Sequence, residues 1–580
     1  MNKIWKLKEL SPENGERPQN DIDSFIKELQ SLKTKVQIPE LILRLLFLRG
    51  VTSYPKVLKF FRPTRDKLYD PFLMKNCDKA TDRLIKAIQE KEKIMVLTDY
   101  DVDGTCGASM FYLFLKHFSL ESTVYIPDRI TEGYGISKNA IDKAKEENIN
   151  LIVSIDCGIT AYEKVEYANS LGIEFIICDH HQPPENIPNA FAILDPLRTD
   201  CEYPFKYLCG TGVAFKLIQA VCKKLSEEDF AYTLLDFVAL ATSSDIVPIT
   251  DENRILVYEG YKLINSNPRP SVKTLIESIG FKSSTITTSS IVFSIAPRIN
   301  AVGRLGDAKR AVELLTSEDP DALDELAETL NTENTSRREI DKSITEDAFM
   351  IQEKVGDIKD CYSIIMHNED WHPGVIGIVA ARLVEKYNLP AIVLTTVNGV
   401  AKGSARSING FNIYEALKKC EDKIIQFGGH YHAAGLEIDI DKLEEFKKAF
   451  NEIATEELSN KQLIPEIEVD AELEIKDITP QLIKMLSFFE PFGPGNMTPI
   501  FMTHNVQIIG EVRYAKSYTH IFKVRDPETK KMFDTIFFSS ADYHDRIITG
   551  AYCSICYSID KNVWNNNITY KLRIRDIKFK

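Results

Sequence analysis

The sequence contains no apolar run of the roughly 18 residues that a membrane span needs. Residues 1–20 have no apolar core of the kind found in signal peptides. The eleven cysteines are scattered without the regular spacing of a disulfide framework. These absences exclude a membrane-embedded protein and a disulfide-stabilised secreted domain. We therefore expect a cytoplasmic protein that does not contact membranes.

An overall excess of basic residues is also missing. The formal net charge is −14, which argues against a protein that coats nucleic acid without specificity. Residues 501–580 differ, because they hold thirteen Lys and Arg against eight Asp and Glu, a surplus of +5 that leaves −19 on the preceding 500 residues. This terminal stretch is a candidate contact for a polyanion, although an ordinary solvated surface explains the same count.

The length and composition are those of a multidomain globular protein. A chain of 580 residues is too long for one core and corresponds to about three or four domains. With 44% hydrophobic and 27% charged residues, the chain is not expected to be disordered.

The most informative stretch is 94–104, where an apolar run of strand length ends in Asp99, Asp101 and Asp103, followed by Gly104. No lysine or arginine lies between residues 94 and 115 to neutralise these carboxylates. Crowded, unpaired carboxylates repel one another and raise one another's pKa. A divalent cation with oxygen ligands is the simplest counter-ion, and a surface turn rich in Asp and Gly is the alternative.

Strands and helices alternate from about residue 71. Further apolar strands are predicted at 123–126, 151–155, 174–178 and 192–194, with helices between them. This alternation predicts a mostly parallel sheet. Each of these five strands is followed by an aspartate: Asp99, Asp128, Asp156, Asp179 and Asp195.

Ligands of open parallel sheets bind outside the carboxyl ends of the strands, so these side chains can converge. A single aspartate there is commonly a turn former, which is the interpretation we favour for Asp128 and Asp195. The fourth strand also supplies His180 and His181, and imidazole beside carboxylates suits Mn²⁺ or related metals. One histidine can bind metal while the other contacts substrate. A later apolar run, 237–244, ends near Asp245, which would complete the same site.

The order and spacing of four motifs resemble the DHH phosphoesterase superfamily. They are Asp101 with Asp103, Asp156-Cys157-Gly158, Asp179-His180-His181, and Asp245. Flanking sequences at 133–135, 210–214 and 297–304 are similar to those of the single-strand-specific DNA exonucleases of that superfamily. The resemblance covers most of the chain.

The resemblance implies catalytic residues that bind two divalent cations, Mn²⁺ or Mg²⁺. One ion would be held by Asp103, Asp156, His180 and Asp245. The other would be held by Asp101 and Asp156, so that Asp156 bridges the two ions. Many members carry a histidine four residues before the aspartate equivalent to Asp101, but here that residue is Leu97. Occupancy of the second site therefore stays open, with Asp99 or water as a substitute ligand.

Several side chains are candidates for binding substrate. Arg298 and Arg304 follow a Ser- and Thr-rich stretch, 283–294, that we interpret as a strand, and arginines near a metal crevice suit bidentate phosphate contacts. Surface salt bridges are the alternative. A polar helix at 320–355 has too little apolar surface to be buried and is expected to connect domains.

Beyond this helix, glycines in 371–377 indicate a strand-to-helix turn whose backbone N–H groups can approach an anion. The sequences 402–407 and 428–435 resemble the DHHA1 domain, which in that superfamily holds the nucleic-acid strand opposite the metal site. The full set of expected substrate-binding residues is His181, Arg298, Asn300, Arg304, Ser404, Arg406, Gly428, Gly429 and His430.

The last part of the chain, after a boundary at 460–465, contains several short alternating strands with basic and aromatic residues. This pattern favours a small barrel of the OB type, a common platform for single strands. Cys553 and Cys556 have CxxC spacing, but no second pair accompanies them, so we do not expect zinc.

The expected fold is α/β: a parallel-sheet DHH domain, a long connecting helix, a smaller α/β DHHA1 domain and a C-terminal OB-like β-barrel. The expected parts are an N-terminal helical segment 1–70, the DHH domain 71–315, the connecting helix 316–358, the DHHA1 domain 359–460 and the OB-like domain 461–580.

The resemblance implies a metal-dependent exonuclease that degrades single-stranded DNA, 5′ to 3′, to 5′-mononucleotides in DNA repair and recombination. Two alternatives stay open: a phosphodiesterase of short RNA or signalling dinucleotides, and a non-catalytic replication scaffold. Single-stranded DNA is the expected partner, helicase and single-strand-binding protein are candidate partners, and a monomer is expected.

Overall fold

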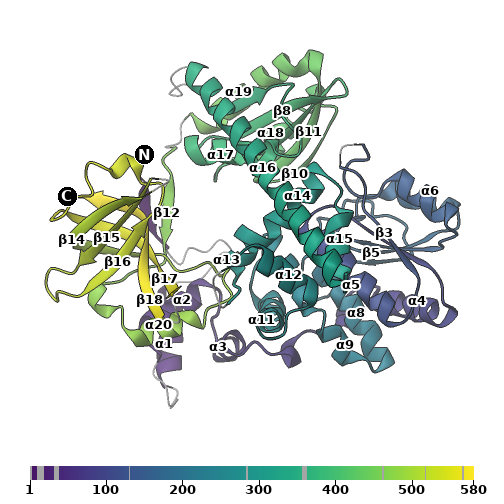
Figure 1. Ribbon diagram of the computed structural model, residues 1–580, viewed down its shortest axis with the longest axis horizontal. Helices are drawn as coiled ribbons and strands as arrows, with labels where there is room; N and C mark the ends of the chain where they lie inside the picture. Colours follow the sequence, from purple (N-terminus) through teal and green to yellow (C-terminus); the bar gives the residue numbers. More distant parts are fainter. Residues whose placement is uncertain are drawn as a thin grey trace. The chain divides into compact units, whose positions relative to one another are not determined.

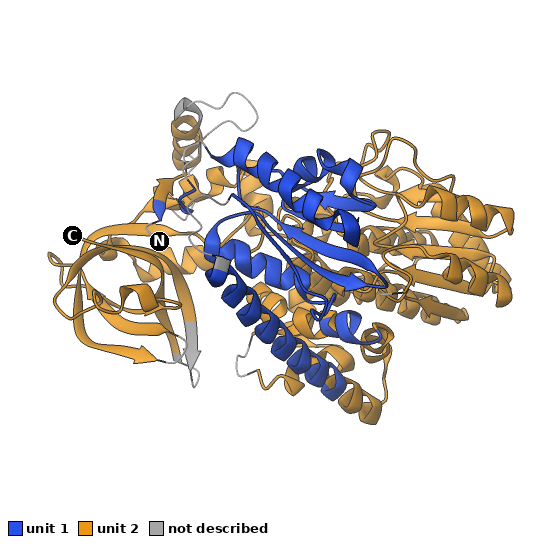
Figure 2. Ribbon diagram, turned by 90° about the horizontal axis from the view of Figure 1, so that it is seen from above, with its two compact units in different colours: residues 1–4, 301–307, 328–466 blue, residues 5–300, 308–327, 467–580 orange. Residues whose placement is uncertain are grey.

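A computed structural model describes residues 3–8, 19–31, 38–129, 131–281, 285–355, 362–459, 463–515, 518–564 and 567–580. The chain divides into two compact units, which Figure 2 colours separately. Unit 1 consists of residues 1–4, 301–307 and 328–466, and unit 2 of residues 5–300, 308–327 and 467–580. None of the described helices is long and apolar enough to cross a membrane.

Unit 2 contains a five-stranded sheet of order β3-β2-β4-β5-β6. All its neighbouring strands are parallel, as the sequence predicts. The strands are β2 (Ile94–Thr98), β3 (Ser122–Tyr125), β4 (Leu151–Ile155), β5 (Glu174–Cys178) and β6 (Ala192–Leu194). Strands β2 and β4 are buried along their whole length, which explains their continuous apolar sequences. The carboxyl ends of the five strands therefore share one edge.

Helices connect the strands and cover the sheet (Figure 1). They include α4 (Cys77–Glu90), α5 (Val102–His117), α6 (Lys138–Glu146) and α7 (Tyr162–Ser170). Ile141 of α6 and Val165 of α7 share a core with Met95, Ile152 and Phe175 of the sheet. This packing holds the strands of the sheet, and with them their carboxyl ends, in place.

A second group of helices follows the sheet. It consists of α8 (Gly210–Leu225), α9 (Glu228–Tyr232), α10 (Leu235–Ser244), α11 (Asp251–Ser266), α12 (Pro270–Ser278) and α15 (Lys309–Thr316). Helices α5, α8 and α10 pack against one another and are almost completely buried. Such all-round burial explains why the stretch before Asp245 has an apolar run but no amphipathic pattern.

The predicted strand at 283–294 is wrong for the described part of that stretch, which begins at residue 285. The chain there forms α13 (Thr288–Ser290), a π-helical turn η3 (Ile291–Ile295) and then α14 (Ala296–Leu305). Thr287 accepts a hydrogen bond from the Ser290 backbone and caps this helix. Ile291 and Ile295 are both buried, so the four-residue helical spacing outweighs the β propensity of Thr, Val and Ile.

The N-terminal part of unit 2 packs with the C-terminal region. Its helices are α1 (Gln19–Ser31), α2 (Glu40–Leu48) and α3 (Tyr54–Phe61). Ile22 and Leu46 share one core with Phe522 and Ile555 of the C-terminal region. Besides the expected helices, the segment 1–70 contains a strand, β1 (Ile4–Leu7), which pairs with β12 (Glu466–Val469). The sequence did not indicate it, because a partner so distant in sequence leaves no local pattern.

The C-terminal region forms the expected barrel. Its elements are β13 (Ala471–Glu472), α20 (Pro480–Ser487), β14 (Phe501–Ala515), β15 (Thr519–Arg525), β16 (Met532–Phe537), β17 (Tyr552–Trp564) and β18 (Asn567–Phe579). The sheet has the order β13-β14-β15-β16-β18-β17, and an additional pairing of β14 with β17 closes five of its strands. Cys553 and Cys556 are buried free thiols on β17.

Unit 1 contains a second sheet, of order β10-β11-β9-β8-β7. Only β7 and β8 are parallel. The elements of this unit include β7 (Ile364–His367), α17 (Ile376–Tyr387), β8 (Ala391–Val397), β9 (Val400–Arg406), α18 (Ile413–Lys418), β10 (Gln426–His430), β11 (Ala433–Asp439) and α19 (Leu443–Leu458). Part of the predicted boundary at 460–465 lies outside the described residues.

The long helix α16 spans Pro320–Val355, as expected, but it is not fully exposed. Ile344 and Ala348 belong to a core of unit 1. Asp341 is also buried, and Arg382 donates a 2.7 Å hydrogen bond to it. One face of α16 is therefore buried despite the polar composition of the helix, because a charged side chain with a partner can occupy a position that usually holds an apolar one.

Candidate metal centre

The turn between β2 and α5 places Asp99, Asp101 and Asp103 at the carboxyl edge of the sheet. Oδ1 of Asp101 caps α5 by accepting hydrogen bonds from the backbone N–H groups of Asp103 (2.7 Å) and Gly104 (3.2 Å). A Cβ atom at Gly104 would lie 2.0 Å from Oδ1 of Asp99. Glycine is therefore required for this turn to close over the Asp99 carboxylate.

Asp103 is held by the first residues of α8. Its two carboxylate oxygens accept hydrogen bonds from the backbone N–H groups of Gly210 (2.6 Å) and Thr211 (2.8 Å). The Thr211 hydroxyl also donates to the Asp103 carbonyl oxygen at 2.6 Å. These bonds fix the orientation of a carboxylate that is 1% exposed.

Asp156 follows the last residue of β4 with a positive φ of 61°, a conformation that is unfavourable for most residues. Its backbone N–H donates to the Cys178 carbonyl oxygen at 2.9 Å. A Cβ atom at Gly210 would lie only 2.7 Å from the Asp156 Cα atom, so the glycine allows α8 to begin directly against Asp156. The unusual backbone turns the carboxylate into the crevice.

Nε2 of His180 lies among three carboxylates. It is 3.0 Å from Oδ1 of Asp156, 3.6 Å from Oδ2 of Asp245 and 3.9 Å from Oδ2 of Asp103. The structure thus brings together the four side chains for which the sequence predicts one shared ion. They come from the ends of β4, β5 and α10 and from the start of α5.

A second group of possible ligands consists of Asp99, Asp101 and Asp156, whose carboxylate oxygens lie within 4.8 Å of one another. Leu97 is completely buried in the core of the sheet and offers no ligand atom. Asp99 thus offers a third oxygen beside Asp101 and Asp156.

The electrostatics of the crevice call for a positive charge. Burial raises the pKa of Asp99, Asp101, Asp156 and Asp245, and repulsion from neighbouring carboxylates, Asp103 among them, raises each further. Oδ1 of Asp156 and Oδ2 of Asp245 are buried and accept no hydrogen bond from the described residues. Crowded carboxylate oxygens together with an imidazole nitrogen suit divalent cations such as Mn²⁺, whose positive charge would offset the repulsion between the carboxylates.

His181 differs from His180 because it is held by Asp179 through a 2.7 Å contact from Nδ1 to Oδ1. Burial alone would raise the pKa of Asp179 and lower that of His181. Their hydrogen bond and the attraction between their charges together outweigh burial, helped at Asp179 by the Ile159 backbone N–H, so the pKa of Asp179 falls to about 2 and the pKa of His181 rises. The Tyr134 hydroxyl donates to the Asp156 carbonyl oxygen (3.1 Å) and lies 3.3 Å from Nε2 of His181.

Asp179 and Tyr134 therefore support site residues, although neither was among the catalytic, metal-binding or substrate-binding residues expected from the sequence. Both lie within motifs that the sequence singles out, Asp179-His180-His181 and 133–135, and this was the signal that could have found them. Asp128 and Asp195 behave as the turn formers we expected. Asp128 accepts a hydrogen bond from the Thr131 backbone (2.8 Å), and Asp195 accepts one from the Leu197 backbone (2.8 Å).

Two of the predicted substrate-binding residues of unit 2 have identifiable contacts. Oδ1 of Asn300 accepts a hydrogen bond from the Val102 backbone at 3.1 Å, which ties it to the aspartate turn. Arg298 donates to the Ser294 carbonyl oxygen one helical turn earlier. A role for either residue in binding substrate stays a prediction.

The other predicted substrate-binding residues lie in unit 1. Gly428 pairs with Gly435, which pairs with Ser404, so three small residues form a row across β10, β11 and β9. Arg406 donates a 3.0 Å hydrogen bond to the Ser404 hydroxyl. Gly429 and His430 are exposed on β10, the edge strand of the sheet. Arg304 donates to the Gly374 carbonyl oxygen at 2.9 Å.

Three family models match the chain. The DHH family N-terminal domain matches residues 93–242, the DHHA1 domain residues 357–456, and the RecJ OB domain residues 469–576. The chain is 36% identical over 563 residues to the single-stranded-DNA-specific exonuclease RecJ of Bacillus subtilis, covering 97% of this chain and 70% of that protein. The chain belongs to the RecJ family. The Escherichia coli RecJ is 33% identical over 490 residues, covering 81% of this chain and 84% of that protein.

Solved RecJ structures have a similar fold. The structure of Thermus thermophilus RecJ in complex with Mn²⁺ matches with a TM-score of 0.82 and 24% identity, covering 100% of this chain and 80% of that one. A structure of exonuclease RecJ bound to manganese matches with a TM-score of 0.59 and 30% identity, covering 67% of this chain and 98% of that one. The arrangement of a DHH domain, a DHHA1 domain and an OB barrel is therefore that of the family.

Proposed function

We propose that this protein is an exonuclease that hydrolyses single-stranded DNA to 5′-mononucleotides, 5′ to 3′, in DNA repair and recombination, and that it requires divalent cations. The observation that carries this proposal is the convergence of Asp103, Asp156 and Asp245 on Nε2 of His180 in a RecJ-family chain. Hydrolysis of a phosphodiester needs a group that neutralises the developing negative charge, and this crevice is built to hold one.

Asp103, Asp156, His180 and Asp245 would hold one cation, and Asp99, Asp101 and Asp156 a second. When bound, such ions supply an activated water and neutralise charge on the scissile phosphate. Both Mn²⁺ and Mg²⁺ suit these ligands, and the imidazole favours Mn²⁺. The carboxylates act as ligands in this scheme and not as general acids.

His181 is the residue placed to contact the substrate phosphate. Asp179 binds its Nδ1 atom, so Nε2 is the nitrogen left to face the crevice. The raised pKa of His181 favours the protonated imidazole, in which Nε2 carries a proton that it can donate to a phosphate oxygen. Tyr134 contacts the same nitrogen and would position it before the substrate arrives.

Unit 1 supplies residues that suit a nucleic-acid backbone. The row of Gly428, Gly435 and Ser404 allows a chain to approach β10 and β11 closely, and Arg406 and His430 offer donors beside it. Arg298 and Arg304 are the further candidates for phosphate contacts. The carbonyl oxygens they bind position their guanidinium groups.

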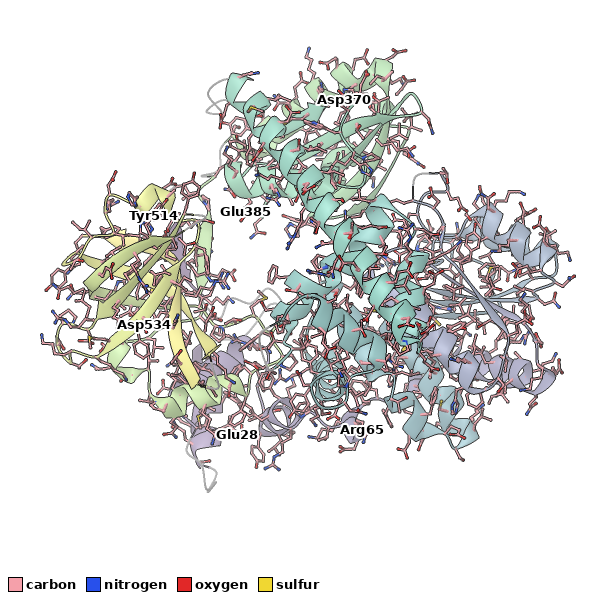
Figure 3. All side chains as sticks on the ribbon, viewed as in Figure 1. Glu28, Arg65, Asp370, Glu385, Tyr514 and Asp534 are labelled. Atoms are coloured by element: carbon pink, nitrogen blue, oxygen red, sulfur yellow. The ribbon has the colours of Figure 1, made fainter. Side chains whose placement is uncertain are left out.

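The barrel carries aromatic side chains that suit stacking on bases. Tyr514, labelled in Figure 3, is 45% exposed, and Tyr518 is 61% exposed, with 6.4 Å between their ring centroids. Stacked aromatics bind single strands with little sequence preference. We further propose that the protein acts in the cytoplasm as a monomer, with a helicase and a single-strand-binding protein as partners.

The test is a nuclease assay on labelled single strands blocked at the 5′ or the 3′ end, with Mn²⁺, with Mg²⁺ or with chelator. Degradation that requires metal and a free 5′ end supports the proposal. Preferential cleavage of a dinucleotide over a long oligonucleotide would instead favour the phosphodiesterase. An intact substrate under all metal conditions would favour the scaffold.

A further inference from the structure

Asp245 differs from the other candidate ligands because it lies in a loop, 245–250, that joins α10 to α11. Ile246, the next residue, has a φ of 57° and is 81% exposed, so the loop is not held by burial of its own side chain there. Other contacts must fix the loop if Asp245 is to stay near His180.

Two hydrogen bonds reach the end of the loop, one from the Asn253 side chain and one to the Pro494 carbonyl oxygen. The Asn253 side-chain amide donates to the Pro248 carbonyl oxygen at 3.0 Å and to the Tyr207 carbonyl oxygen at 2.6 Å. The backbone N–H of Ile249 donates to the Pro494 carbonyl oxygen at 2.7 Å. The acceptor of the Ile249 hydrogen bond belongs to a distant segment, the turn 488–497, which precedes strands β14 to β18.

This turn lies directly against the loop. A Cβ atom at Gly493 would be 2.3 Å from Cγ1 of Ile249, and one at Gly495 would be 2.9 Å from Cγ2 of Thr250. Both distances are shorter than non-bonded atoms allow. The glycines therefore let the turn pack directly against the side chains of Ile249 and Thr250, so that a displacement of the turn would displace the loop.

Arg254, at the start of α11, binds the turn with its guanidinium group. Nη1 donates to the carbonyl oxygens of Phe489 (2.8 Å) and Pro491 (3.3 Å), and Nη2 donates to those of Phe488 (2.9 Å) and Glu490 (2.9 Å). Nε donates to the Phe60 carbonyl oxygen at 3.1 Å. The side chain is buried, and five carbonyl oxygens surround it, so it acts as a fixed anchor for four consecutive residues of the turn.

Arg49 binds the other end of the turn, donating to Oδ1 of Asn496 (3.0 Å) and to the Met497 carbonyl oxygen (2.8 Å). Between the two arginines lies a cavity of about 200 Å³, lined among others by Phe60, Thr250 and Gly495. The turn is also held by apolar packing, because Phe489 is buried and its ring contacts those of Phe60 and Phe61. The arginines add hydrogen bonds at both ends of the turn, so they fix the path of its backbone.

We propose that the turn 488–497 is a positioning element of the metal centre and that Arg254 is a positioning residue, which holds Asp245 through the turn at the distance from His180 that a cation needs. The inference rests on the proposed function, because it assigns Asp245 to a catalytic cation. It makes the C-terminal region part of the metal centre and not only a platform for DNA.

The test compares Arg254→Gln, Arg254→Lys and wild type for binding of Mn²⁺ without DNA, measured from the electron paramagnetic resonance of free Mn²⁺. Loss of a group that touches a metal ligand typically weakens affinity by about 10- to 100-fold. Arg254 acts on Asp245 through the turn, so we expect a loss at the lower end, about tenfold, for one ion in Arg254→Gln. Arg254→Lys should recover part of the affinity, because an ammonium group can still donate three hydrogen bonds. The Mn²⁺ concentration for half-maximal cleavage should shift equally, with an unchanged KM for the oligonucleotide.

Arg83→Gln is the matched control. Arg83 is also nearly buried and binds Glu92 and Glu174, which lie before β2 and at the start of β5, at the opposite edge of the sheet from the metal centre. It should lose thermal stability without losing Mn²⁺ affinity. Wild-type Mn²⁺ affinity in Arg254→Gln, or an equal loss in Arg83→Gln, would overturn the proposal.

Gly493→Ala decides the matter if Arg254→Gln does not fold, because the added methyl group displaces Ile249 without removing a buried charge. Unchanged Mn²⁺ binding in this variant would also count against the proposal. The two hypotheses fail separately. A wild type that binds Mn²⁺ but leaves single-stranded DNA intact contradicts the proposed function, whereas a shift in Mn²⁺ affinity among these variants still supports the positioning role.

Discussion

The crevice at the edge of the β2–β6 sheet and the row of small residues across β9–β11 differ in burial and charge. The crevice gathers carboxylates that are buried and held by backbone N–H groups, as Asp103 is by Gly210 and Thr211. Gly428 and Gly435 of the row are exposed, as are Gly429 and His430 beside it on β10, and Arg406 lies near it on β9. Binding a small cation requires ligands fixed before it arrives, whereas holding a long polyanion requires accessible backbone and donors.

Asp156→Asn should have the largest effect, because this carboxylate belongs to both groups of ligands. We expect cleavage to fall by on the order of a thousandfold, since a catalytic cation contributes several kcal/mol to transition-state stabilisation. Asparagine is preferable to alanine because it tolerates the positive φ at this position. Single-turnover cleavage of labelled single-stranded DNA measures the loss.

The same variant should remain folded, because a crowded carboxylate with a raised pKa does not stabilise the metal-free protein. Circular dichroism and thermal melting in chelator check this. Retained cleavage would mean that Asp156 does not bind a catalytic metal. Unfolding of the variant would mean that Asp156 has a structural role.

Arg406→Ala tests the other side of the comparison. We expect the KM for single-stranded DNA to rise by about 10- to 100-fold, because a hydrogen bond to a charged group contributes about 1.5–3 kcal/mol. Mn²⁺ affinity should not change. Lys402→Ala is the matched control on the same strand, because Lys402 is already paired with Glu437 at 3.1 Å. A change in kcat alone would contradict a role in binding.

Tyr514→Ala tests whether the barrel binds single strands by stacking bases on its exposed aromatic side chains. Loss of one stacked base costs about 1–3 kcal/mol, so binding of a long single strand should weaken by about 5- to 100-fold. Cleavage of a dinucleotide should be unaffected. Tyr207→Ala, which removes a 56% exposed ring outside the barrel, serves as the control. Fluorescence anisotropy with oligonucleotides of increasing length measures the loss of affinity. A loss that is equal for short and long oligonucleotides would contradict a role for Tyr514 in binding long strands.

The smallest expected effect is on the pH dependence of stability in chelator. The raised pKa values of Asp99, Asp101, Asp156 and Asp245 mean that the folded state binds more protons, so stability falls as pH rises above about 4. The raised pKa of His181 acts in the same direction above about pH 6.5. Asp179, with a pKa of about 2, loses its stabilising effect only at more acidic pH.

Thermal midpoints in chelator should therefore be higher at about pH 5 than at pH 8, by about 2–4 °C for each kcal/mol. Asp156→Asn should flatten this dependence. Added Mn²⁺ should reverse it, because metal and protons compete for the same oxygens. A wild-type profile that rises with pH in chelator would show that the carboxylates are not crowded in solution.

Much of the site follows from local sequence. Asp101, Asp156 and His180 each follow an apolar strand or a glycine-containing turn, and a parallel sheet necessarily brings such positions to one edge. The π-helical turn near 291–295 and the strand β1 were not predictable in this way. The former depends on burial of Ile291 and Ile295, and the latter on a partner more than 400 residues away.

The sequence by itself determined the chemistry of the crevice, because the kinds of ligand, their order and the alternation of strands and helices are local properties. Only the tertiary structure decided which groups hold those ligands in place. Tyr134 at His181, the N-terminus of α8 at Asp103, and Arg254 with the turn 488–497 near Asp245 are contacts between distant segments. Such contacts form only when the chain packs, so no local pattern records them.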